Sequence, residues 1–508
     1  MRILDTPFAR IQSLPTGRAA AFPKSGDFGY DSEPRYRNKN RLGLGEFVLA
    51  TSAILALAWP CAAKPFVVVD ENGRPACQVA QPPEATPAEK TALKMLIEYV
   101  GKSTGARLES VERDASKATK PVISLEVSPA WERLKNRRGH GPDGFTVEVQ
   151  ADRVRIIGDN PSSVIYGVAS LLERGLGIRW LAPGELWTVV PKRRHVAIPP
   201  GTYRETPAFA KRVIHITGVH EHDGVKYPHW HFGSADWAMR NRLNRKFEHV
   251  GRTQLRDVMA ERGLTPLRGG HAMAFWMPNE PFFAAHPEYY RFDGERRKPL
   301  RGGGTQLNYS SVETSALIAQ RVLDFLERDP VAETVGVDLN DGYGFSLDRQ
   351  SRQEWFYDER GMPIVSDSVF GFTNRVAEIV SRRFPDVAIG QLAYTRYYHQ
   401  PPRFPLHPNV GIRFTLYRGS QTHPMCEARN ESDAQMRREL QEWRKLTDKL
   451  LIYEYLTGYW GQMMFASGVR MIADDIRWYR KMGFEGAMTE YEPGKPAREM
   501  LYVYARLL

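Results

Sequence analysis

The sequence has few cysteines, and it lacks the patterns that several common enzyme classes require. Its 508 residues include three cysteines, Cys61, Cys77 and Cys426, with no Cys-x-x-Cys pair and no His/Cys spacing typical of zinc. Three cysteines give no disulfide framework, although Cys77 and Cys426 leave room for one bridge. There is no Gly-x-Ser-x-Gly elbow of a serine hydrolase and no dinucleotide fingerprint. We therefore expect neither a metal nor a cofactor.

A concentrated basic stripe and a long apolar run are also absent. The net charge is +11, but the excess is spread along the chain, whereas nucleic-acid binding needs clustered Lys and Arg. Residues 47–59 form a short apolar run that cannot span a bilayer as a helix. Basic residues from Arg35 to Arg41 precede this run, and Pro60-Cys61-Ala62-Ala63 follows it.

A basic flank, a short apolar stretch and a small-residue site are typical of a secretory signal. We therefore expect a leader over residues 1–63, a secreted or periplasmic protein, and no integral membrane span after its removal. The stretch before Arg35 is unusually long for such a signal. A membrane anchor or a disordered tail is the alternative.

Residues 65–205 alternate short strands with two helices, which predicts a small α/β domain. Thr86, Pro87 and Glu89 form a capping box that opens the first helix, and Gly101 is expected to end it. Residues 145–149 and 153–157 are expected to pair as a hairpin. Asn160 and Pro161 begin the second helix, which Gly175 and Gly177 end.

Several short motifs carry a resemblance to known families. Gly158-Asp159-Asn160-Pro161, Tyr166-Gly167-Val168, Gly177-Ile178-Arg179-Trp180 and Pro183-Gly184 resemble the domain that precedes the barrel in α-glucuronidases and β-hexosaminidases. From about Phe66 onward the chain is similar to a bacterial family known as domain of unknown function 4838. Gly269-Gly270-His271, His286-Pro287-Glu288-Tyr289-Tyr290 and Asn340-Asp341-Gly342 resemble that family's recurring motifs. The resemblance implies a glycosidase-like barrel without naming a substrate.

Residues 206–508 alternate strands and helices, which favours a (β/α)8 TIM barrel preceded by the small α/β accessory domain. The expected strands are 212–217, 246–250, 265–267, 333–339, 387–393, 410–416, 450–455 and 485–489. No helix fits between the fifth and sixth strands, where four prolines occur. The chain ends soon after the eighth strand, as expected of a barrel domain truncated at its C-terminus.

Carboxylates at the ends of strands four and seven are the candidates for the catalytic residues. Barrel enzymes place working residues at the C-terminal ends of their strands. Cleavage of a glycosidic bond needs a proton donor and a second carboxylate that attacks or activates water. Asp341 and Glu454 fall on the two strands that many barrel glycosidases use, and Asp338 is the alternative donor. The resemblance carries the donor role onto Asp341 by position.

Other strand-end residues are candidates for binding the sugar. Asn340 suits a hydrogen bond to a sugar hydroxyl, and Glu490 or Glu492 offers a second carboxylate or a substrate contact. The remaining candidates are polar or aromatic: His271, Trp276, Tyr394, Arg418, Tyr459 and Trp460. We therefore expect an exported glycoside hydrolase acting on a poly- or oligosaccharide that contains a uronic acid or amino sugar.

Two other functions remain open at this point. His220 and His222 mimic the His-x-His metal pair of amidohydrolase barrels, but the other strand ends offer an incomplete ligand set. The second alternative is a carbohydrate-binding protein without catalysis. Turnover in a glycan screen, and metal analysis, distinguish the three.

Overall fold

The computed structural model describes most of the chain after the leader. The described residues are 64–82, 84–112, 119–216, 221–222, 225–226, 228–250, 256–301, 304–417, 419, 423–456, 468–491 and 498–508. Residues 62–508 form one compact unit. The expected leader lies outside the described residues. No helix in the described part of the chain has the length and apolar character needed to cross a membrane.

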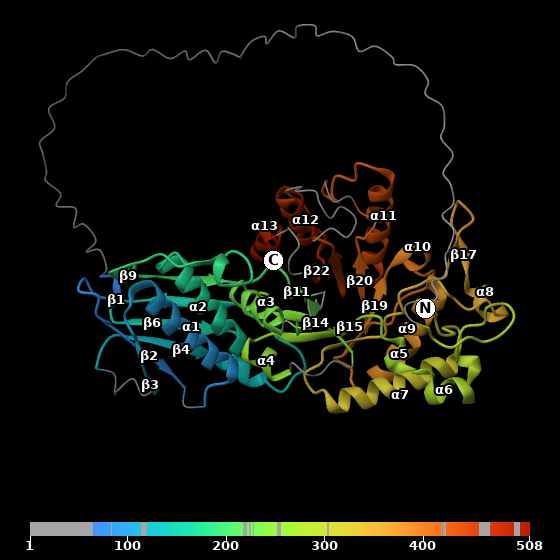
Figure 1. Ribbon diagram of the computed structural model, residues 1–508, viewed down its shortest axis with the longest axis horizontal. Helices are drawn as coiled ribbons and strands as arrows, with labels where there is room; N and C mark the ends of the chain where they lie inside the picture. Colours follow the sequence, from blue (N-terminus) through green and yellow to red (C-terminus); the bar gives the residue numbers. More distant parts are fainter. Residues whose placement is uncertain are drawn as a thin grey trace, which may run out of the picture. The chain divides into compact units, whose positions relative to one another are not determined.

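A six-stranded mixed sheet forms the accessory region (Figure 1). Its strands, in order across the sheet, are β10 (Gly201–Glu205), β5 (Phe145–Val149), β6 (Arg153–Gly158), β4 (Val122–Val127), β2 (Gln78–Gln81) and β3 (Glu109–Glu112). The expected hairpin is confirmed, because β5 and β6 pair antiparallel. Strand β1 (Phe66–Val69) pairs instead with β9 (Val196–Ile198) in a separate ribbon.

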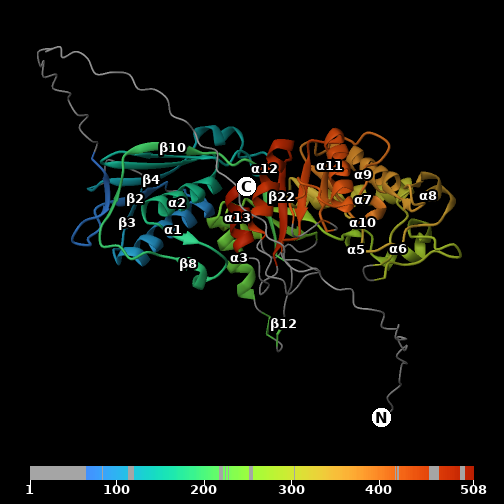
Figure 2. The same ribbon diagram turned by 90° about the horizontal axis from the view of Figure 1, so that it is seen from above.

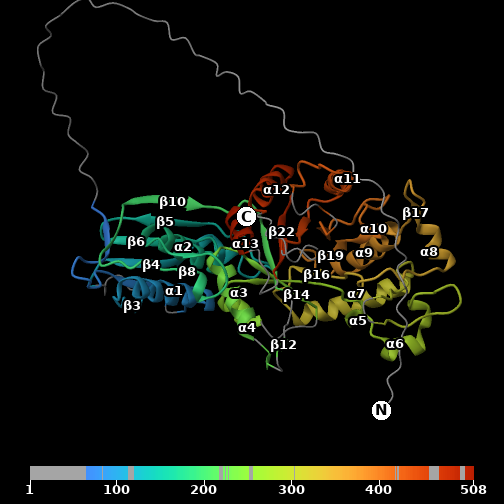
Figure 3. The ribbon, with the colours of Figure 1, turned by 45° about the horizontal axis from the view of Figure 1, so that its top comes forward.

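Two helices, α1 (Pro87–Thr104) and α2 (Pro161–Gly175), lie side by side against this sheet (Figure 3). The predicted capping box of α1 is present, since Thr86 and Glu89 bond reciprocally. The expected end of α1 at Gly101 is wrong. The helix continues to Thr104, and Gly105 ends it with φ of 79°, a left-handed conformation that glycine adopts without steric cost.

Eight parallel strands close into a barrel, as predicted, so the fold is a TIM barrel with a small α/β domain before it. The strands, in order around the barrel, are β11 (Lys211–Ile216), β14 (Arg245–His249), β15 (Thr265–Gly269), β16 (Thr334–Gly336), β19 (Ala388–Ala393), β20 (Val410–Thr415), β21 (Leu450–Glu454) and β22 (Gly486–Tyr491). Strand β22 pairs with β11 along six residues and closes the barrel (Figure 2). Strand β16 is shorter than expected.

Helices surround the strands. The long ones are α3 (Pro228–Arg240), α7 (Val312–Arg328), α9 (Ser366–Ser381), α11 (Glu431–Leu446), α12 (Val469–Met482) and α13 (Arg498–Leu507). Shorter helices are α4 (Arg256–Glu261), α5 (Met273–Trp276), α6 (Asn279–Ala285), α8 (Arg349–Glu354) and α10 (Thr395–Tyr398). The prediction that no helix fits between strands five and six is wrong for one turn, because α10 lies there.

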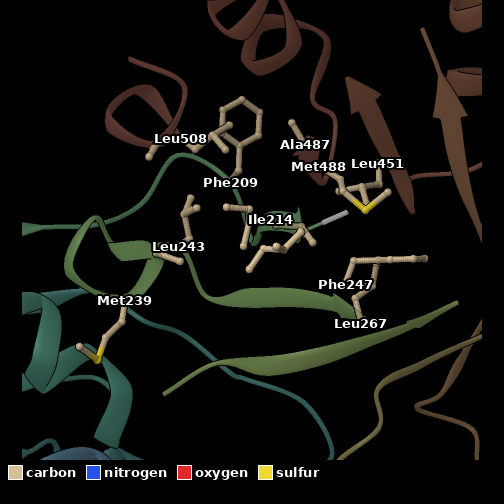
Figure 4. Close-up of a cluster of buried hydrophobic side chains, with 14 of the residues drawn as sticks. Phe209, Ile214, Met239, Leu243, Phe247, Leu267, Leu451, Ala487, Met488 and Leu508 are labelled. Atoms are coloured by element: carbon tan, nitrogen blue, oxygen red, sulfur yellow. The ribbon is translucent and has the colours of Figure 1, made fainter. Parts of the chain in front are cut away.

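Buried contacts join the accessory region to the base of the barrel. Arg212 on β11 pairs with Asp143, and the Nδ2 group of Asn244 donates to the same carboxylate at 2.9 Å. Figure 4 shows Phe209 and Leu508 together beside the barrel strands. The backbone N–H of Ala208 donates to the carbonyl of Leu508 at 3.2 Å, which ties the end of α13 to the segment before β11. The division of this unit at residue 206 stays a prediction.

Candidate active site

One cavity of about 330 Å³ lies at the C-terminal ends of the barrel strands. Its lining residues are His215, Phe247, His249, Gly270, His271, Asp341, Leu392, Tyr394, Tyr417, Tyr453, Tyr455 and Glu490. Each of the eight strands, or the segment directly after it, contributes at least one of these residues. This is the position at which TIM-barrel enzymes carry their active sites.

Asp341 stands on the turn after β16 and exposes its carboxylate to the cavity. The side chain of Gln306 fixes this turn. The side-chain amide of Gln306 donates to the carbonyls of Asn340 at 2.7 Å and Gly342 at 2.9 Å. Burial, and then the nearby Asp341 carboxylate, raise the pKa of Tyr394 above its usual value. Tyr394 therefore stays a neutral phenol beside Asp341.

Glu490 on β22 supplies the second carboxylate of the cavity, and it is buried. The hydroxyl of Tyr453 donates to Glu490, and the Nδ1 atom of His215 lies 3.0 Å from that hydroxyl. Burial, and then the proximity of His249, lower the pKa of His215 to about 3, so its ring is neutral. Since the hydroxyl hydrogen of Tyr453 points to Glu490, His215 donates its Nδ1 hydrogen to the phenol oxygen. This chain of donors therefore ends on an oxygen of Glu490.

Aromatic rings form much of the remaining wall. Tyr394 and Tyr417 meet with ring centroids 4.8 Å apart, and Tyr453 stacks on Tyr455 at 4.9 Å. His271 closes another side, with its Nδ1 group donating to the carbonyl of Leu339 at 2.6 Å. Flat apolar rings beside two carboxylates suit a pyranose, whose C–H faces stack on aromatic rings while its hydroxyls bond to polar groups.

Asp338 does not reach the cavity. It is fully buried in the barrel interior, where the guanidinium of Arg413 pairs with it. The backbone N–H groups of Gly270 and Leu392 donate to its two oxygens at 2.8 and 2.9 Å. With both carboxylate oxygens occupied by donors, Asp338 has no atom to offer a substrate. The structure therefore favours Asp341 over Asp338 as the candidate donor.

Three glycines make room for this buried pair. A side chain at Gly269, Gly336 or Gly390 would place its first carbon within 3.0 Å of Asp338 or Arg413 atoms. These glycines come from three successive barrel strands, β15, β16 and β19. The pair consequently occupies the interior below the cavity and forms part of its support.

Glu454 faces away from the cavity, contrary to the expectation for a catalytic carboxylate. Side chains alternate along a strand, and Tyr453 and Tyr455 take the inward positions on β21. Glu454 is buried on the outer side, where it accepts a hydrogen bond from the hydroxyl of Tyr479 on α12. The second carboxylate of the site is therefore Glu490 rather than Glu454.

The outward position of Glu454 has a measurable consequence for stability. Burial and the charge of Asp475 raise the pKa of Glu454 to about 8, and burial raises that of Asp475 to about 7. In the unfolded chain these groups titrate near pH ~4. Between about pH 4 and 8 the folded state therefore binds more protons, so the free energy of unfolding falls as pH rises.

We expect Glu454→Gln to flatten this dependence, because the amide mimics the protonated acid at every pH. Urea unfolding of the wild type and the variant, each at about pH 5 and about pH 9, measures the effect. The wild type should lose more stability on going to the higher pH. Equal losses in the two proteins would contradict the assignment.

The other predicted site residues divide into three groups. His271, Tyr394 and Glu490 line the cavity with Asp341. Trp276 and Asn340 are buried elsewhere: the indole N–H of Trp276 donates to the Gly336 carbonyl at 3.0 Å, and Asn340 donates to the Thr305 carbonyl at 2.9 Å. Outside the described residues lie Arg418, Tyr459, Trp460, Glu492 and His220.

The amidohydrolase alternative requires a metal site that includes His220 and His222. Only the backbone of His222 is described, so the His220/His222 pair of the amidohydrolase alternative is not placed. Across the described residues, no group of three His, Cys, Asp or Glu side chains is arranged to hold a metal ion. Cys77 and Cys426 are free thiols, so the single bridge that the sequence left open is not formed.

Sequence reasoning missed His215, His249 and Tyr453. His215 and Tyr453 are the second-last residues of their strands, and His249 is the last residue of its strand. Most of the expected site residues come only after the strand ends. The available signal was alternation: His215 lies between two isoleucines on β11, and His249 follows Phe247 by two residues on β14, so both line the cavity. A polar side chain at the last inward position of a barrel strand points at the mouth.

A family model described as domain of unknown function 4838 matches residues 183–508, which is more than half of the chain. The chain belongs to this family. The match includes the whole barrel and only the last strands of the accessory region, a shorter stretch than the resemblance suggested. No curated protein matches the sequence.

Solved structures of glycoside hydrolases share the fold. A family GH115 4-O-methyl-α-glucuronidase with specificity for decorated arabinogalactans has a TM-score of 0.54 at 14% identity, over 87% of this chain and 56% of that one. The chain thus spans just over half of that enzyme. The family GH20 β-N-acetylhexosaminidase of Streptomyces coelicolor A3(2) has a TM-score of 0.51 at 13% identity, over 88% of both chains. The β-N-acetylhexosaminidase of Bacteroides fragilis gives 0.50 at 12%, over 88% of both.

Proposed function

We propose that the chain is a glycoside hydrolase whose two working carboxylates are Asp341 and Glu490. One observation carries the proposal: all eight barrel strands converge on a single cavity, and these carboxylates enter it from strands four and eight. The barrel neighbours named above, an α-glucuronidase and two β-hexosaminidases, support the same class of reaction. A glycan that contains a uronic acid or an amino sugar is the proposed substrate.

We assign the two carboxylates different roles by their position in the cavity. Asp341 is exposed on a fixed turn, from which it can hand a proton to the leaving glycosidic oxygen and recover one from water. Glu490 is buried and accepts a hydrogen bond from the hydroxyl of Tyr453, and a donor of this kind favours the carboxylate form. A carboxylate in that position stabilises the positive charge that develops at the anomeric carbon. Water adds its hydroxyl to that carbon as the C–O bond breaks.

The charged state of Glu490 can be tested directly. We expect Glu490→Gln to lower kcat about 10²-fold, because a neutral amide no longer stabilises the developing charge. A screen of glycans for released reducing sugar, run with wild type and variant, supplies the substrate and the rate. Tyr453→Phe should show a smaller loss, since it removes one donor and leaves the charge. Full turnover by Glu490→Gln would remove this residue from the mechanism.

Export is proposed on the sequence pattern alone. The basic flank before residue 47, the apolar run 47–59 and the small residues Ala62 and Ala63 fit a cleaved signal. A polysaccharide too large to enter the cell requires an enzyme outside the cytoplasm. Mass determination of the N-terminus of the protein recovered from its native host tests cleavage after Ala63.

A further inference from the structure

A second cavity of about 640 Å³ is lined by residues of the β17–β18 hairpin and of helices α10 and α11. Figures 1 and 3 show where these elements lie at the periphery of the barrel. The hairpin consists of β17 (Phe356–Tyr357) and β18 (Pro363–Ile364). The cavity is larger than the one that holds Asp341 and Glu490. Nothing in the proposed reaction uses it.

Aromatic and polar side chains share the lining of this second cavity. The ring of Tyr357 is 61% exposed at its rim. Beside it, the guanidinium of Arg403 lies 4.7 Å from the ring centre of Phe356 and pairs with Asp367 at 2.7 Å. The second cavity therefore presents an open aromatic face next to fixed hydrogen-bonding groups, as a sugar ring requires.

The charges of the second cavity nearly cancel. Its lining includes five carboxylates (Asp358, Glu359, Glu431, Glu439 and Glu442) and four guanidinium groups (Arg360, Arg396, Arg403 and Arg438). Arg438 and Glu431 pair with each other at 2.7 Å. Interleaved donors and acceptors suit the hydroxyls of a neutral sugar, which donate and accept at once. A polyanion would meet five carboxylates, and nucleic acid would need a clustered positive surface.

Helix α10 connects the second cavity to the active site. Tyr394, directly before this turn, lines the active-site cavity, whereas Arg396, within it, lines the second one. Tyr397 follows Arg396 in this turn. Its ring is 5.1 Å from that of Tyr343 and 5.2 Å from the guanidinium of Arg396. Neighbouring residues of one short segment therefore line the two cavities.

The backbone holds α10 in a fixed and unusual conformation. Thr395 has φ of 56°, a left-handed value that is rare for a β-branched residue and persists only when surrounding contacts enforce it. The carbonyl of Tyr397 accepts the N–H of Val365 at 2.7 Å. His399 bonds Glu439 through Nδ1 and the Thr415 carbonyl through Nε2 at 2.8 Å. Contacts from α9, α11 and the barrel thus fix the partition between the cavities.

We propose that the second cavity binds a neutral portion of the same glycan whose bond is broken at Asp341 and Glu490. This inference rests on the proposed function, because it takes the chain to be an enzyme that acts on a glycan. Tyr357 supplies the stacking face, and Arg360, Arg396 and Glu442 supply hydrogen bonds to hydroxyls. The site favours long substrates over short ones, because only a long glycan reaches both cavities.

Binding is measured first, on the full chain carrying Asp341→Asn, so that no turnover is needed. An array of neutral and uronic-acid oligosaccharides of increasing length is the probe. We expect binding to long oligosaccharides with neutral segments, and an affinity about tenfold lower when Tyr357→Ala is added. Leu186→Ala, which removes an exposed apolar side chain from the accessory region, is the matched control and should change nothing.

Kinetics separate the second cavity from the proposed function. With a substrate found by the screen, Tyr357→Ala should lower the ratio of kcat/KM for long over short oligosaccharides about tenfold. An unchanged ratio, binding that ignores Tyr357→Ala, or no binding to any oligosaccharide would overturn the second site. Binding that depends on Tyr357 without turnover by the wild type would keep the second site and reject the hydrolase.

Discussion

Asp341→Asn is expected to lower kcat about 10³-fold on a natural glycan, because the amide cannot give a proton to the leaving oxygen. Asp341 is exposed on a turn held by Gln306, so the substitution leaves the packing of the barrel intact. KM should change little, since the residue acts on the transition state more than on the bound substrate. Steady-state rates on the substrate found by the screen give both values.

The leaving group distinguishes a proton donor from a residue that only binds the sugar. A 2,4-dinitrophenyl glycoside of the same sugar releases a phenolate that needs no proton. Asp341→Asn should therefore break the glycosidic bond of this substrate at close to the rate of the wild type. Glu454→Gln is the matched carboxylate control. Its side chain faces Tyr479, away from the cavity, and turnover should persist. A loss in Glu454→Gln as large as that in Asp341→Asn would contradict the assignment.

The alternation of strands and helices made the barrel predictable from the sequence. Most barrel strands are short apolar or β-branched runs followed by polar residues, whereas β14 is largely charged. The structure places all eight strands within a few residues of their expected positions. Strand ends are local features, so residues directly after them could be assigned to the mouth. His271, Asp341 and Tyr394 were found in this way, and all three line the cavity.

The face of a strand that points inward could not be read from local sequence. In Tyr453-Glu454-Tyr455 either the tyrosines or the glutamate can face the barrel, and a shift of one residue exchanges them. The pairing of the strands decides which side chains face inward. Tyr453 lies opposite Met488 on β22, and Glu490, two residues further along β22, lines the cavity. The tyrosines therefore face inward. The apolar neighbours of Glu454 marked it as buried, but they did not show on which side.

The role of Asp338 depended on a partner far away in the chain. Its position below the cavity follows from its pairing with Arg413, 75 residues later in the chain. No local pattern links the two. Glycines on three neighbouring strands are the only trace of the pair in the sequence, and their meaning becomes visible only when the strands are side by side.

Asp338→Ala is expected to lower the free energy of unfolding by about 3–5 kcal/mol, the cost of leaving one partner of a buried ion pair uncompensated. Arg413 is 2% exposed and lies 5.6 Å from the ring centre of Phe247, so water cannot replace the lost carboxylate. The N–H groups of Gly270 and Leu392 lose their acceptor as well. Urea unfolding followed by tryptophan fluorescence measures the change.

Two further variants show whether the charge is the cause. Asp338→Asn keeps an acceptor oxygen for one of the two N–H groups and should lose less than Asp338→Ala. This variant also covers the case in which the alanine variant fails to fold. Glu378→Ala removes the partner of Arg382 from an exposed pair at 2.9 Å and should cost at most about 1 kcal/mol. If Asp338→Ala cost no more than Glu378→Ala, the buried pair would not support the floor of the cavity, and Asp338 would again be open to a role in the reaction.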